Sequence, residues 1–485
     1  MTEEYCFMTN DHEERNKAIV TKAKNILLIN PSENKKTMLY EAFPSGALLL
    51  LGSMLLERGH RVKVLHLVAD GITRSRLEGE IRDFGPDIIG ITMSTFQTHS
   101  AREISVLAKQ INDRILVVAG GPHPSALKHK ILTDFPGIDV VVTGEGEHAF
   151  MEIVEGRPIP EIRGICYHGG ETPPRPLSCD LDHIPLTRLD LINIKRFAGA
   201  DPQMAYPTMF IMGSRGCPFQ CTFCNKSIWG NSVRFRQPAR IVREVEWMHE
   251  QYGIREIYFQ DDTFNLRRSW TEEIFQLLID KKLNKKMYFT TSFRANERLV
   301  DEKLLKMAKA AGFWLLFYGV ESGNQQMLDS MGKGLTLNEL KRAFRLTHAA
   351  GLKTKASFMI GLTGESRETF QDTIALWREL HPYVTGFGAV IPFPGTAFDR
   401  EVTAKGHKLS DNYDDFSPNT IVVRTDALSA EDIARLLKEF KTLILARFFI
   451  DLLKLRYWKM IVFCLISPRY IRHILRRIGS YLKIV

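Results

Sequence analysis

The chain contains the stretch Gly213-Ser214-Arg215-Gly216-Cys217-Pro218-Phe219-Gln220-Cys221-Thr222-Phe223-Cys224, directly after a strand-like run at 208–212. Its three cysteines have C-x3-C-x2-C spacing, so three thiolates can surround one face of a metal centre. No fourth Cys or His lies at comparable spacing nearby, whereas a structural zinc site usually takes four ligands. The pattern therefore favours an iron–sulfur cubane with one open iron. A zinc knuckle, or three reduced cysteines in a core, is the alternative.

Short strands alternate with helices along the chain on the carboxyl side of these cysteines. Strands are expected at 208–213, 256–260, 288–291, 314–318, 353–358 and 384–391, and helices at 238–252, 270–282, 301–311, 337–350 and 368–380. Glu365 is expected to cap the last of these helices. Six such repeats predict a partial (β/α)6 barrel, similar to a TIM barrel, whose reactive groups lie at the carboxyl ends of the strands.

Residues 24 to about 155 show the same alternation on the amino side of the cysteines. Apolar runs lie at 25–31, 62–67, 88–93, 115–119 and 140–143, with helix-length segments at 46–58, 99–112 and 124–133. Alternating short strands and helices predict a doubly wound, Rossmann-like parallel sheet. The fold class expected for the whole chain is therefore α/β, with the sheet ahead of the barrel.

Loops rich in small residues follow the expected strands of this sheet. They read Asn30-Pro31-Ser32-Glu33, Thr92-Met93-Ser94-Thr95-Phe96, Gly120-Gly121-Pro122-His123-Pro124-Ser125 and Thr143-Gly144-Glu145-Gly146-Glu147. Such a sheet binds its ligand at these loops, and small residues let backbone and a large planar ligand approach closely. Helix caps and tight turns use the same residues, so the loops indicate a site without identifying its ligand.

The cysteine stretch resembles the signature of the radical S-adenosylmethionine (SAM) superfamily, including the aromatic Phe223 before the last cysteine. The resemblance implies that Cys217, Cys221 and Cys224 each hold one iron of a 4Fe-4S cluster. The fourth iron would chelate the amino and carboxylate groups of SAM. Electron transfer from the cluster would then cleave SAM to a 5'-deoxyadenosyl radical, and a flavodoxin or ferredoxin is the implied electron donor.

Two loops of the expected sheet, Gly-Gly-Pro-His-Pro-Ser and Val-Val-Thr-Gly-Glu-Gly-Glu, resemble the cobalamin-binding domain of cobalamin-dependent radical SAM enzymes. That family includes magnesium-protoporphyrin ester cyclases and hopanoid-modifying enzymes. The motif D-x-H-x-x-G, which supplies an axial histidine in other cobalamin proteins, is absent after the first strand, so base-off cobalamin is implied. His123 suits a polar helix cap as well as a ligand contact. The implied cobalamin contacts are Ser94, Thr95, Gly120, Gly121, His123, Gly144, Glu145 and Gly146.

Polar residues at the ends of the expected barrel strands are candidates to hold SAM. The resemblance implies that Asp262 contacts the methionine amino group and that Glu321, followed by Ser322, meets the ribose or amino group. It also implies that Gly361 lies in the adenine-side motif. Arg294 could pair with the SAM carboxylate through a bidentate fork. A helix cap is the alternative for Asp262, and a surface cation is the alternative for Arg294.

The formal net charge of +9 is concentrated in the tail of the 485-residue chain. Residues 441–485 contain ten Lys or Arg and one acid, so the rest of the chain is balanced. Nucleic-acid binding is not expected, because these cations alternate with apolar residues in the tail instead of covering the core domains. The longest uncharged run, 460–468, is far short of the ~20 residues that span a bilayer. The tail is expected either to lie on an anionic membrane surface or to pack on the barrel as a helical cap.

Residues 1–15 are acidic and polar and lack the apolar core of a secretory signal. A reducing cytoplasmic location is therefore expected, at the inner face of the membrane if the tail binds lipid. The expected organisation is a polar leader (1–23), a cobalamin-binding domain (24–155), a Pro-rich linker (156–206), a radical SAM core (207–430) and a helical, basic, amphipathic segment (431–485).

The leading functional hypothesis is an enzyme that methylates an unactivated carbon of a small apolar or lipid-like substrate. A radical cyclase or carbon–carbon bond-forming enzyme on the same scaffold, without methyl transfer, is the first alternative. A non-catalytic cobalamin sensor is the second alternative. No HExxH motif, Walker loop or serine elbow occurs in a suitable context, so zinc-protease, P-loop and serine-hydrolase chemistry are not indicated.

Overall fold

The computed structural model describes residues 22–34, 41–199, 202–417 and 420–453. The predicted leader, apart from residues 22 and 23, lies outside the described residues. The tail beyond residue 453, with its uncharged run at 460–468, lies outside them as well.

The N-terminal half is built on a seven-stranded sheet with the order β2-β1-β3-β4-β5-β6-β7. Its first five strands are parallel. They are β1 (Asn25–Asn30), β2 (Arg61–His66), β3 (Ile88–Thr92), β4 (Leu116–Gly120) and β5 (Val140–Val142). The helices around them are α1 (Gly46–Glu57), α2 (Arg74–Phe84), α3 (Thr98–Ile111), α4 (Pro122–Leu127), α5 (Lys130–Asp134) and α6 (Glu147–Val154).

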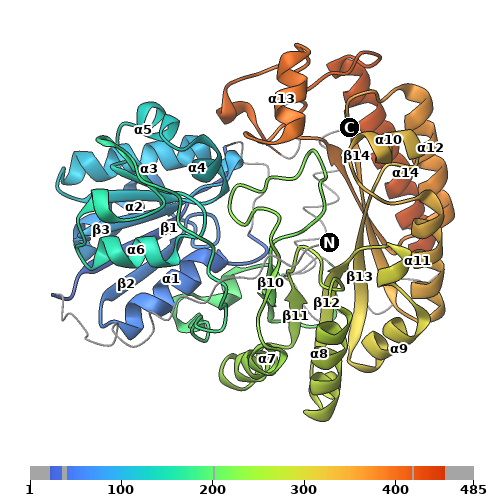
Figure 1. Ribbon diagram of the computed structural model, residues 1–485, viewed down its shortest axis with the longest axis horizontal. Helices are drawn as coiled ribbons and strands as arrows, with labels where there is room; N and C mark the ends of the chain where they lie inside the picture. The colour runs from blue at the N-terminus through green and yellow to red at the C-terminus, as the bar shows by residue number, and fades with distance from the viewer. Residues whose placement is uncertain (1–21, 35–40, 200–201, 418–419, 454–485) are drawn as a thin grey trace.

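Strand β1 shows why this sheet is apolar along its whole length. It lies between β2 and β3, and helices cover both faces of the sheet (Figure 1). Leu27 and Ile29 pack into one core with α2 and α3, whereas Ile26 and Leu28 pack into a second core with α1 and α6. All four side chains are completely buried, as expected for a parallel strand covered on both faces.

The predicted linker adds two strands to this sheet. β6 (Ile165–Tyr167) pairs antiparallel with β5, and β7 (Gly170–Glu171) pairs antiparallel with β6. The two short strands form a hairpin that extends the sheet at its β5 edge. The sheet is therefore parallel through β5 and ends in an antiparallel edge.

The second half is a six-stranded, all-parallel sheet with the order β15-β14-β13-β12-β11-β8, which confirms the partial barrel. The strands are β8 (Thr208–Ile211), β11 (Glu256–Phe259), β12 (Tyr288–Phe293), β13 (Phe313–Glu321), β14 (Lys353–Ile360) and β15 (Val384–Ala389). The helices that accompany them are α7 (Pro238–Tyr252), α8 (Arg268–Asp280), α9 (Glu302–Ala310), α10 (Gln325–Ser330), α11 (Leu337–Ala349) and α12 (Arg367–Leu380). Figure 1 shows the two halves side by side, with the short strand β10 (Arg234–Phe235) between them.

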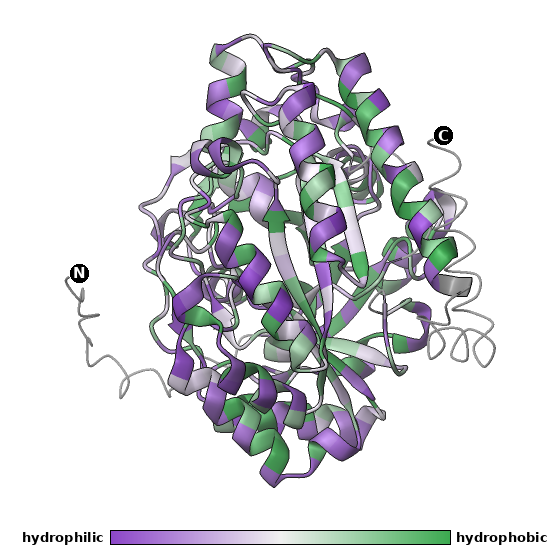
Figure 2. Ribbon diagram, turned by 90° about the vertical axis from the view of Figure 1, so that its right-hand side faces the viewer, coloured by the Kyte–Doolittle hydropathy of each residue, from purple (hydrophilic) through white to green (hydrophobic). Residues whose placement is uncertain are grey.

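Helix α14 (Ala430–Leu453) covers the last strands of the barrel. The Phe440 ring lies 4.5 Å from the Phe387 ring of β15 and 5.9 Å from the Phe358 ring of β14, measured between centroids. The described part of the tail also packs on the barrel, as one of the two expectations held, because Leu443 and Ile444 contact the barrel core and Arg447 donates to the carbonyl oxygen of Pro382 at 3.0 Å. Near the end of this helix Phe449 and Ile450 remain 50% and 51% exposed, and Figure 2 shows hydrophobic and hydrophilic residues interspersed along the helices on this side.

Hydrogen bonds and an ion pair join the two halves through the segment after α13 (Ala397–Ala404). Asp414 accepts a hydrogen bond from Thr98 Oγ1 at 2.8 Å and pairs with Arg102 at 2.7 Å, both on α3. Asn34, after β1, donates to the carbonyl oxygen of Tyr413 at 2.8 Å. The carboxyl-terminal part of the barrel thus reaches back to the strand ends of the first sheet.

Candidate active site and cofactor cavity

The cysteine loop leaves the barrel at the carboxyl end of β8. It begins in β9 (Ser214–Arg215), which pairs antiparallel with β10. Ser214 donates a hydrogen bond of 2.5 Å to Asp261, which follows β11. At Gly216, with φ +92°, a Cβ atom would collide with the carbonyl oxygen of Ser232. Only glycine suits this left-handed position, which turns the chain into the cysteines.

The three cysteines differ in exposure, and two of them interact directly. Cys221 is buried, Cys217 is half-buried and Cys224 is exposed. A hydrogen bond from the Cys224 thiol, together with nearby Lys333 and Arg294, lowers the pKa of Cys221 to about 5 against the effect of burial. The same hydrogen bond raises the pKa of Cys224. Lys333 acts on both cysteines in the same direction and favours their thiolates, the form that binds metal.

The three thiols of the loop are the donor set that an iron–sulfur cluster takes. Within the described part of the chain, no three His, Cys, Asp or Glu side chains converge as the ligands of one metal ion would. In a cubane each cysteine binds a different iron, so the sulfurs need not meet at one point. The donor set therefore fits the predicted cluster.

Arg294, a predicted SAM contact, lies beside the cysteine loop. Its guanidinium carbon is 3.4 Å from the centroid of the Phe219 ring, between the first two cysteines. The guanidinium also donates to the side chain of Asn296 at 2.7 Å and to the carbonyl oxygen of Lys333. Arg294 is buried, so the alternative of a surface cation is wrong.

Glu321 and Lys333 form a buried ion pair at the carboxyl end of β13. Lys333 Nζ lies 2.7 Å from Glu321 Oε1, and the two side chains are 8% and 9% exposed. Ser357 on β14 also donates to Glu321, at 3.2 Å. Glu321 has a φ of +68°, which is uncommon outside glycine and marks local strain of the kind found at functional sites. Ser322 is buried and caps the next turn by accepting from the N–H of Asn324 at 3.2 Å.

The two aspartates after β11 have different environments. Asp261 is buried, receives hydrogen bonds from the Ser214 hydroxyl and the Gly213 N–H, and has its pKa raised to about 7 by burial. The Asp262 side chain is open to a cavity, while surrounding protein raises its pKa by desolvation. Of the two, Asp262 is the residue placed to meet a ligand.

Gly361, at the end of β14, lies under α14. Its N–H donates to Glu365 Oε2 at 2.5 Å, and its φ is +95°. Glu365 is completely buried, and burial raises its pKa to about 7. The expectation that Glu365 caps the next helix is wrong, because Ser366 is the N-cap residue of α12.

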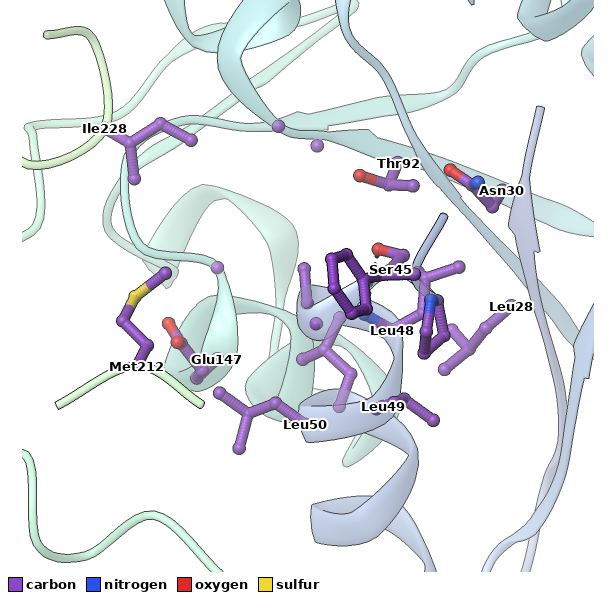
Figure 3. A pocket seen from close by; sticks show the side chains of 18 of the residues that line it. Leu28, Asn30, Ser45, Leu48, Leu49, Leu50, Thr92, Glu147, Met212 and Ile228 are labelled. Carbon is purple, nitrogen blue, oxygen red and sulfur yellow. Dashed lines mark hydrogen bonds between the residues drawn. The ribbon is translucent and has the colours of Figure 1, made fainter. Parts of the chain in front are cut away.

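A cavity of about 840 Å³ lies between the strand ends of the first sheet and the barrel. Figure 3 shows Leu28, Asn30 and Thr92 of the sheet on one side, and Met212 and Ile228 of the barrel half on the other. The first turns of α1 provide a third, apolar wall. Residues lining this cavity include Leu28, Asn30, Glu41, Ala47, Leu48, Thr92, Gly120, Gly121, Gly144, Glu145, Gly146, Glu147, Arg215, Ile228, Trp229, Gln260 and Asp262.

Five of the eight predicted cobalamin contacts line this cavity, and three are engaged elsewhere. Gly120, Gly121, Gly144, Glu145 and Gly146 belong to the lining. The other three are Ser94, whose N–H donates to Gln97, and the buried pair Thr95 and His123, whose side chains lie 3.1 Å apart. His123 also packs on Tyr413, with 4.8 Å between ring centroids. Among the described residues that line the cavity there is no histidine.

The cavity wall fits an amide-bearing planar ligand. Its leucines and glycines offer flat apolar contact, and Asn30 and Thr92 add polar groups at the strand ends. Glu41 Oε2 is buried, and no described residue provides a hydrogen-bond partner for it. Burial raises the pKa of Glu41 to about 8, so its carboxyl group can stay protonated and donate a hydrogen bond to a carbonyl oxygen. Cobalamin carries amide groups around a flat ring, so these residues are compatible with it.

The acidic loop after β5 binds the cysteine loop across this cavity. Glu145 pairs with Arg215 at 2.7 Å and with Arg234 at 2.9 Å, and Glu147 pairs with Arg215 at 2.6 Å. The Glu145 carboxylate is therefore committed to two arginines. Any contact that Glu145 makes with a ligand is shared with this ion-pair network.

Comparison with known proteins agrees with this geometry. The B12 binding domain model matches residues 37–154, and the Radical SAM superfamily model matches residues 211–376. A protein of Pyrococcus horikoshii named uncharacterized methyltransferase PH0819 is 33% identical over 426 residues, which cover 86% of this chain and 91% of that protein. The chain belongs to the cobalamin-dependent radical SAM family.

Further relatives of this radical SAM enzyme include a protein named as a cyclase and a solved methyltransferase. The anaerobic magnesium-protoporphyrin IX monomethyl ester cyclase of Rubrivivax gelatinosus is 27% identical over 81% of this chain and 71% of that protein. The radical SAM methyltransferase TsrM of Kitasatospora setae, solved with cobalamin and a [4Fe-4S] cluster, has a TM-score of 0.66 at 21% identity. The match covers 79% of this chain and 75% of TsrM. At this identity the TsrM structure supports the fold alone.

Family membership confirms the three predicted cofactors of the radical SAM enzyme, which are a 4Fe-4S cluster, SAM and cobalamin. It also favours an enzyme over the cobalamin sensor considered from the sequence. Across the described residues, no helix has both the length and the apolar character needed to cross a bilayer.

Sequence reasoning missed three charged residues of this site. Lys333 was overlooked because a lone lysine between two glycines looks like a solvated turn, although it is buried. Arg234 belongs to no motif in the sequence. Only its pairing in register with Arg215 in the folded chain shows that it is part of the site. Glu41 belongs to no motif in the sequence, and only the folded chain brings it to the cavity.

Proposed function

We propose that this radical SAM enzyme methylates an unactivated carbon of a small apolar or lipid-like substrate. The observation that carries the proposal is the cavity shared by the two halves, because a single space is lined by Gly120 and Gly144 of the B12-binding sheet and by Asp262 of the barrel. A methyl donor held by the sheet and a radical generated in the barrel require such a common space. When bound, the cluster and SAM supply a 5'-deoxyadenosyl radical, and cobalamin supplies the methyl group.

The residues divide by cofactor in this proposal. Cys217, Cys221 and Cys224 hold the cluster. Asp262 and Glu321 orient the polar groups of SAM, and the glycines at the ends of β4 and β5 support the cobalamin ring. Ser322 follows Glu321 at the carboxyl end of β13, and Gly361, at the carboxyl end of β14, shapes the adenine side of the barrel.

Arg294 has a modified role in the proposal. Its guanidinium is already bonded to Asn296 and to the Lys333 backbone and is stacked on Phe219. A remaining N–H is available to a carboxylate, while the stacked ring keeps the cysteine loop in place. Arg294 therefore acts both on the SAM carboxylate and on the loop that holds the cluster.

An apolar substrate is supported by two features of the chain. The cavity walls formed by Leu28, Leu48 and Trp229 are apolar, and α14 exposes Phe449 and Ile450 next to the basic tail. A helix end of this composition can rest on an anionic membrane surface, where lipid-like substrates are found. A cytoplasmic reductant such as a flavodoxin or ferredoxin completes the proposal, because the cluster must be reduced before SAM is cleaved.

The test is anaerobic reconstitution of the full chain with iron, sulfide and hydroxocobalamin. The loaded enzyme is incubated with a reductant, SAM carrying a deuterated methyl group and a lipid extract, and the products are analysed by mass spectrometry. The proposal expects a product that carries the labelled methyl group, together with S-adenosylhomocysteine and 5'-deoxyadenosine. Absence of both SAM-derived products would contradict the proposal.

The same assay separates methyl transfer from the second candidate. A cyclase or bond-forming reaction is favoured by the 27% identity to the protoporphyrin ester cyclase of Rubrivivax gelatinosus. That reaction predicts 5'-deoxyadenosine without S-adenosylhomocysteine and a product without label. A magnesium-porphyrin ester added in place of the lipid extract tests this candidate directly.

A further inference from the structure

The ribbon that begins the cysteine loop contains two arginines directly opposite each other. In the antiparallel pair β9–β10, Arg215 is in register with Arg234. The two side chains are 11% and 10% exposed, so water does little to separate their charges. Like charges directly opposite on a strand pair are destabilising. The ribbon therefore needs an anion at this position.

The anion comes from the other half of the chain. Both oxygens of Glu145 accept hydrogen bonds from Arg234, at 2.9 Å each, and Oε1 also accepts from Arg215 at 2.7 Å. Glu147 accepts from the second amino group of Arg215 at 2.6 Å. Although burial opposes ionisation, the hydrogen bonds from Arg234 and Arg215 lower the pKa of Glu145. The Glu145 carboxylate thus remains charged, and together with Glu147 it fits the fork of Arg215.

Two further contacts join the same loops. Ser227, after the last cysteine, donates to the carbonyl oxygen of Pro122 at 3.1 Å. A Cβ atom at Gly144, whose φ is +73°, would lie 3.8 Å from the carbonyl oxygen of Ile228. The segment before the cysteines and the segment after them are therefore both in contact with cavity-lining loops of the first sheet.

From these contacts we infer that Arg215, Glu145 and Glu147 are positioning residues, which fix the distance between the cysteine loop and the cobalamin edge of the sheet. Arg215 lies two positions before Cys217, and Glu145 lies between Gly144 and Gly146 of the cavity lining. The network thus joins the two cofactor loops directly, side chain to side chain. The inference rests on the proposed function for the presence of both cofactors at these loops.

The test measures the separation of the two metal centres in the loaded, full-length enzyme. The reduced cluster and cob(II)alamin each carry an unpaired spin, so pulsed electron paramagnetic resonance reports the distance between them and the width of its distribution. We expect one narrow distance in the wild type. Arg215→Met should broaden this distribution and shift it to longer distances, and Arg215→Lys, which keeps the charge but loses the fork, should give an intermediate width.

Asp139→Asn is the matched control. Asp139 directly precedes β5, at the opposite end of the strand from Glu145, and pairs with Lys109 at 2.6 Å. Its loss removes an ion pair from the same strand without touching either cofactor loop, so the distance distribution should remain that of the wild type. An equal broadening in this variant would show that any lost ion pair loosens the sheet, and would overturn the inference.

The outcomes distinguish this inference from the proposed function. If the wild type binds no cobalamin or forms no cluster, the proposed function fails and the inference fails with it. If the wild type binds both and Arg215→Met leaves the distribution unchanged, the inference alone is overturned. Should Arg215→Met fail to load its cofactors, Glu147→Gln decides instead, since it removes one of the two acids and leaves the ribbon intact. An unchanged distribution in that variant would equally overturn the inference.

Discussion

The two parallel sheets of this enzyme present different chemistry at their carboxyl ends. Strands β4 and β5 of the first sheet end in glycines around an open cavity, and few charges lie there apart from the acidic loop. Strands β12 and β13 of the barrel end in Arg294 and Glu321, which are buried and bonded to other protein groups. At the sheet end, glycines leave room for a ligand. At the barrel end, charged side chains are fixed by ion pairs and hydrogen bonds with other protein groups.

The difference follows from the ligands that each end is proposed to bind. A large ring with amide groups needs room and flat contact, which small residues provide. A small charged co-substrate and a cluster need fixed charges in a water-poor site, where preorganised charges are most effective. Variants that affect one end without the other therefore test whether this division of roles is real.

The largest effect is expected for Cys217→Ala, which acts on the barrel end alone. Loss of one of three cluster ligands should abolish the brown chromophore, lower bound iron and sulfide to background and eliminate SAM cleavage. Cobalamin binding should remain, because the cavity wall is intact. Cys166→Ala, which removes a buried thiol from β6, is the control and should keep the cluster. Loss of cobalamin in Cys217→Ala would contradict the division between the two ends.

Lys333→Met tests the mutual pairing of charges at the barrel end. Removal of the cation leaves Glu321 charged in a site where its side chain is 9% exposed. Breaking a buried pair in this way costs about 3–5 kcal/mol of unfolding free energy, which urea unfolding monitored by circular dichroism would detect. The double variant Lys333→Met/Glu321→Gln removes both charges and should recover most of the loss. A single variant as stable as the wild type would show that the pair is dispensable.

Ala47→Trp tests the role of open space at the sheet end. Ala47 lies in the first turn of α1 and is an exposed part of the cavity lining. An indole at this position should occupy part of the cavity and weaken cobalamin binding about tenfold or more, which equals ~1.4 kcal/mol. Equilibrium dialysis with hydroxocobalamin measures the effect. Ala47→Ser should bind as the wild type does, and iron content should be normal in both variants.

The architecture was largely predictable, because it depends on local patterns. Alternating apolar runs and helical segments were enough for both sheets, and the C-x3-C-x2-C spacing was enough to assign the radical SAM family. The predicted ends of the strands were less accurate where a functional residue interrupts the hydrophobic pattern. β13 was expected to end at Tyr318 but continues to Glu321, since the strand carries a charged residue into the barrel interior at a positive φ.

Contacts between distant parts of the chain were not predictable in the same way. Glu145 was expected to contact cobalamin through a motif, yet its carboxylate binds Arg215 and Arg234, which lie far along the sequence. His123 had two interpretations that its neighbours alone could not separate, and the structure buries its ring against Tyr413. Hydrophobic periodicity specifies which face of a helix or strand is buried. It does not specify which loop of the other half of the chain will contact that helix or strand.

Glu41→Gln tests a buried ionisable group that lies among the small residues of the sheet end. Burial raises the pKa of Glu41 to about 8 from an unfolded value near 4.5, and the carboxylates of Asp70 and Glu33 add to the shift. The Asn30 amide and the Ala69 N–H act in the opposite direction. A raised pKa means that the folded state retains the proton longer than the unfolded state.

The stability contributed by this proton is fully present below pH ~4.5 and is lost as pH rises through about 8. The wild type should therefore lose stability relative to Glu41→Gln over that range, whereas the amide of the variant does not titrate. Urea midpoints of the apoprotein at several pH values between these limits measure the difference. Asp87→Asn, at the amino end of the same sheet, serves as a control for general charge effects. Parallel pH profiles for the wild type and Glu41→Gln would mean that Glu41 is ionised in the folded protein, and the sheet end would then carry a fixed charge like the barrel end.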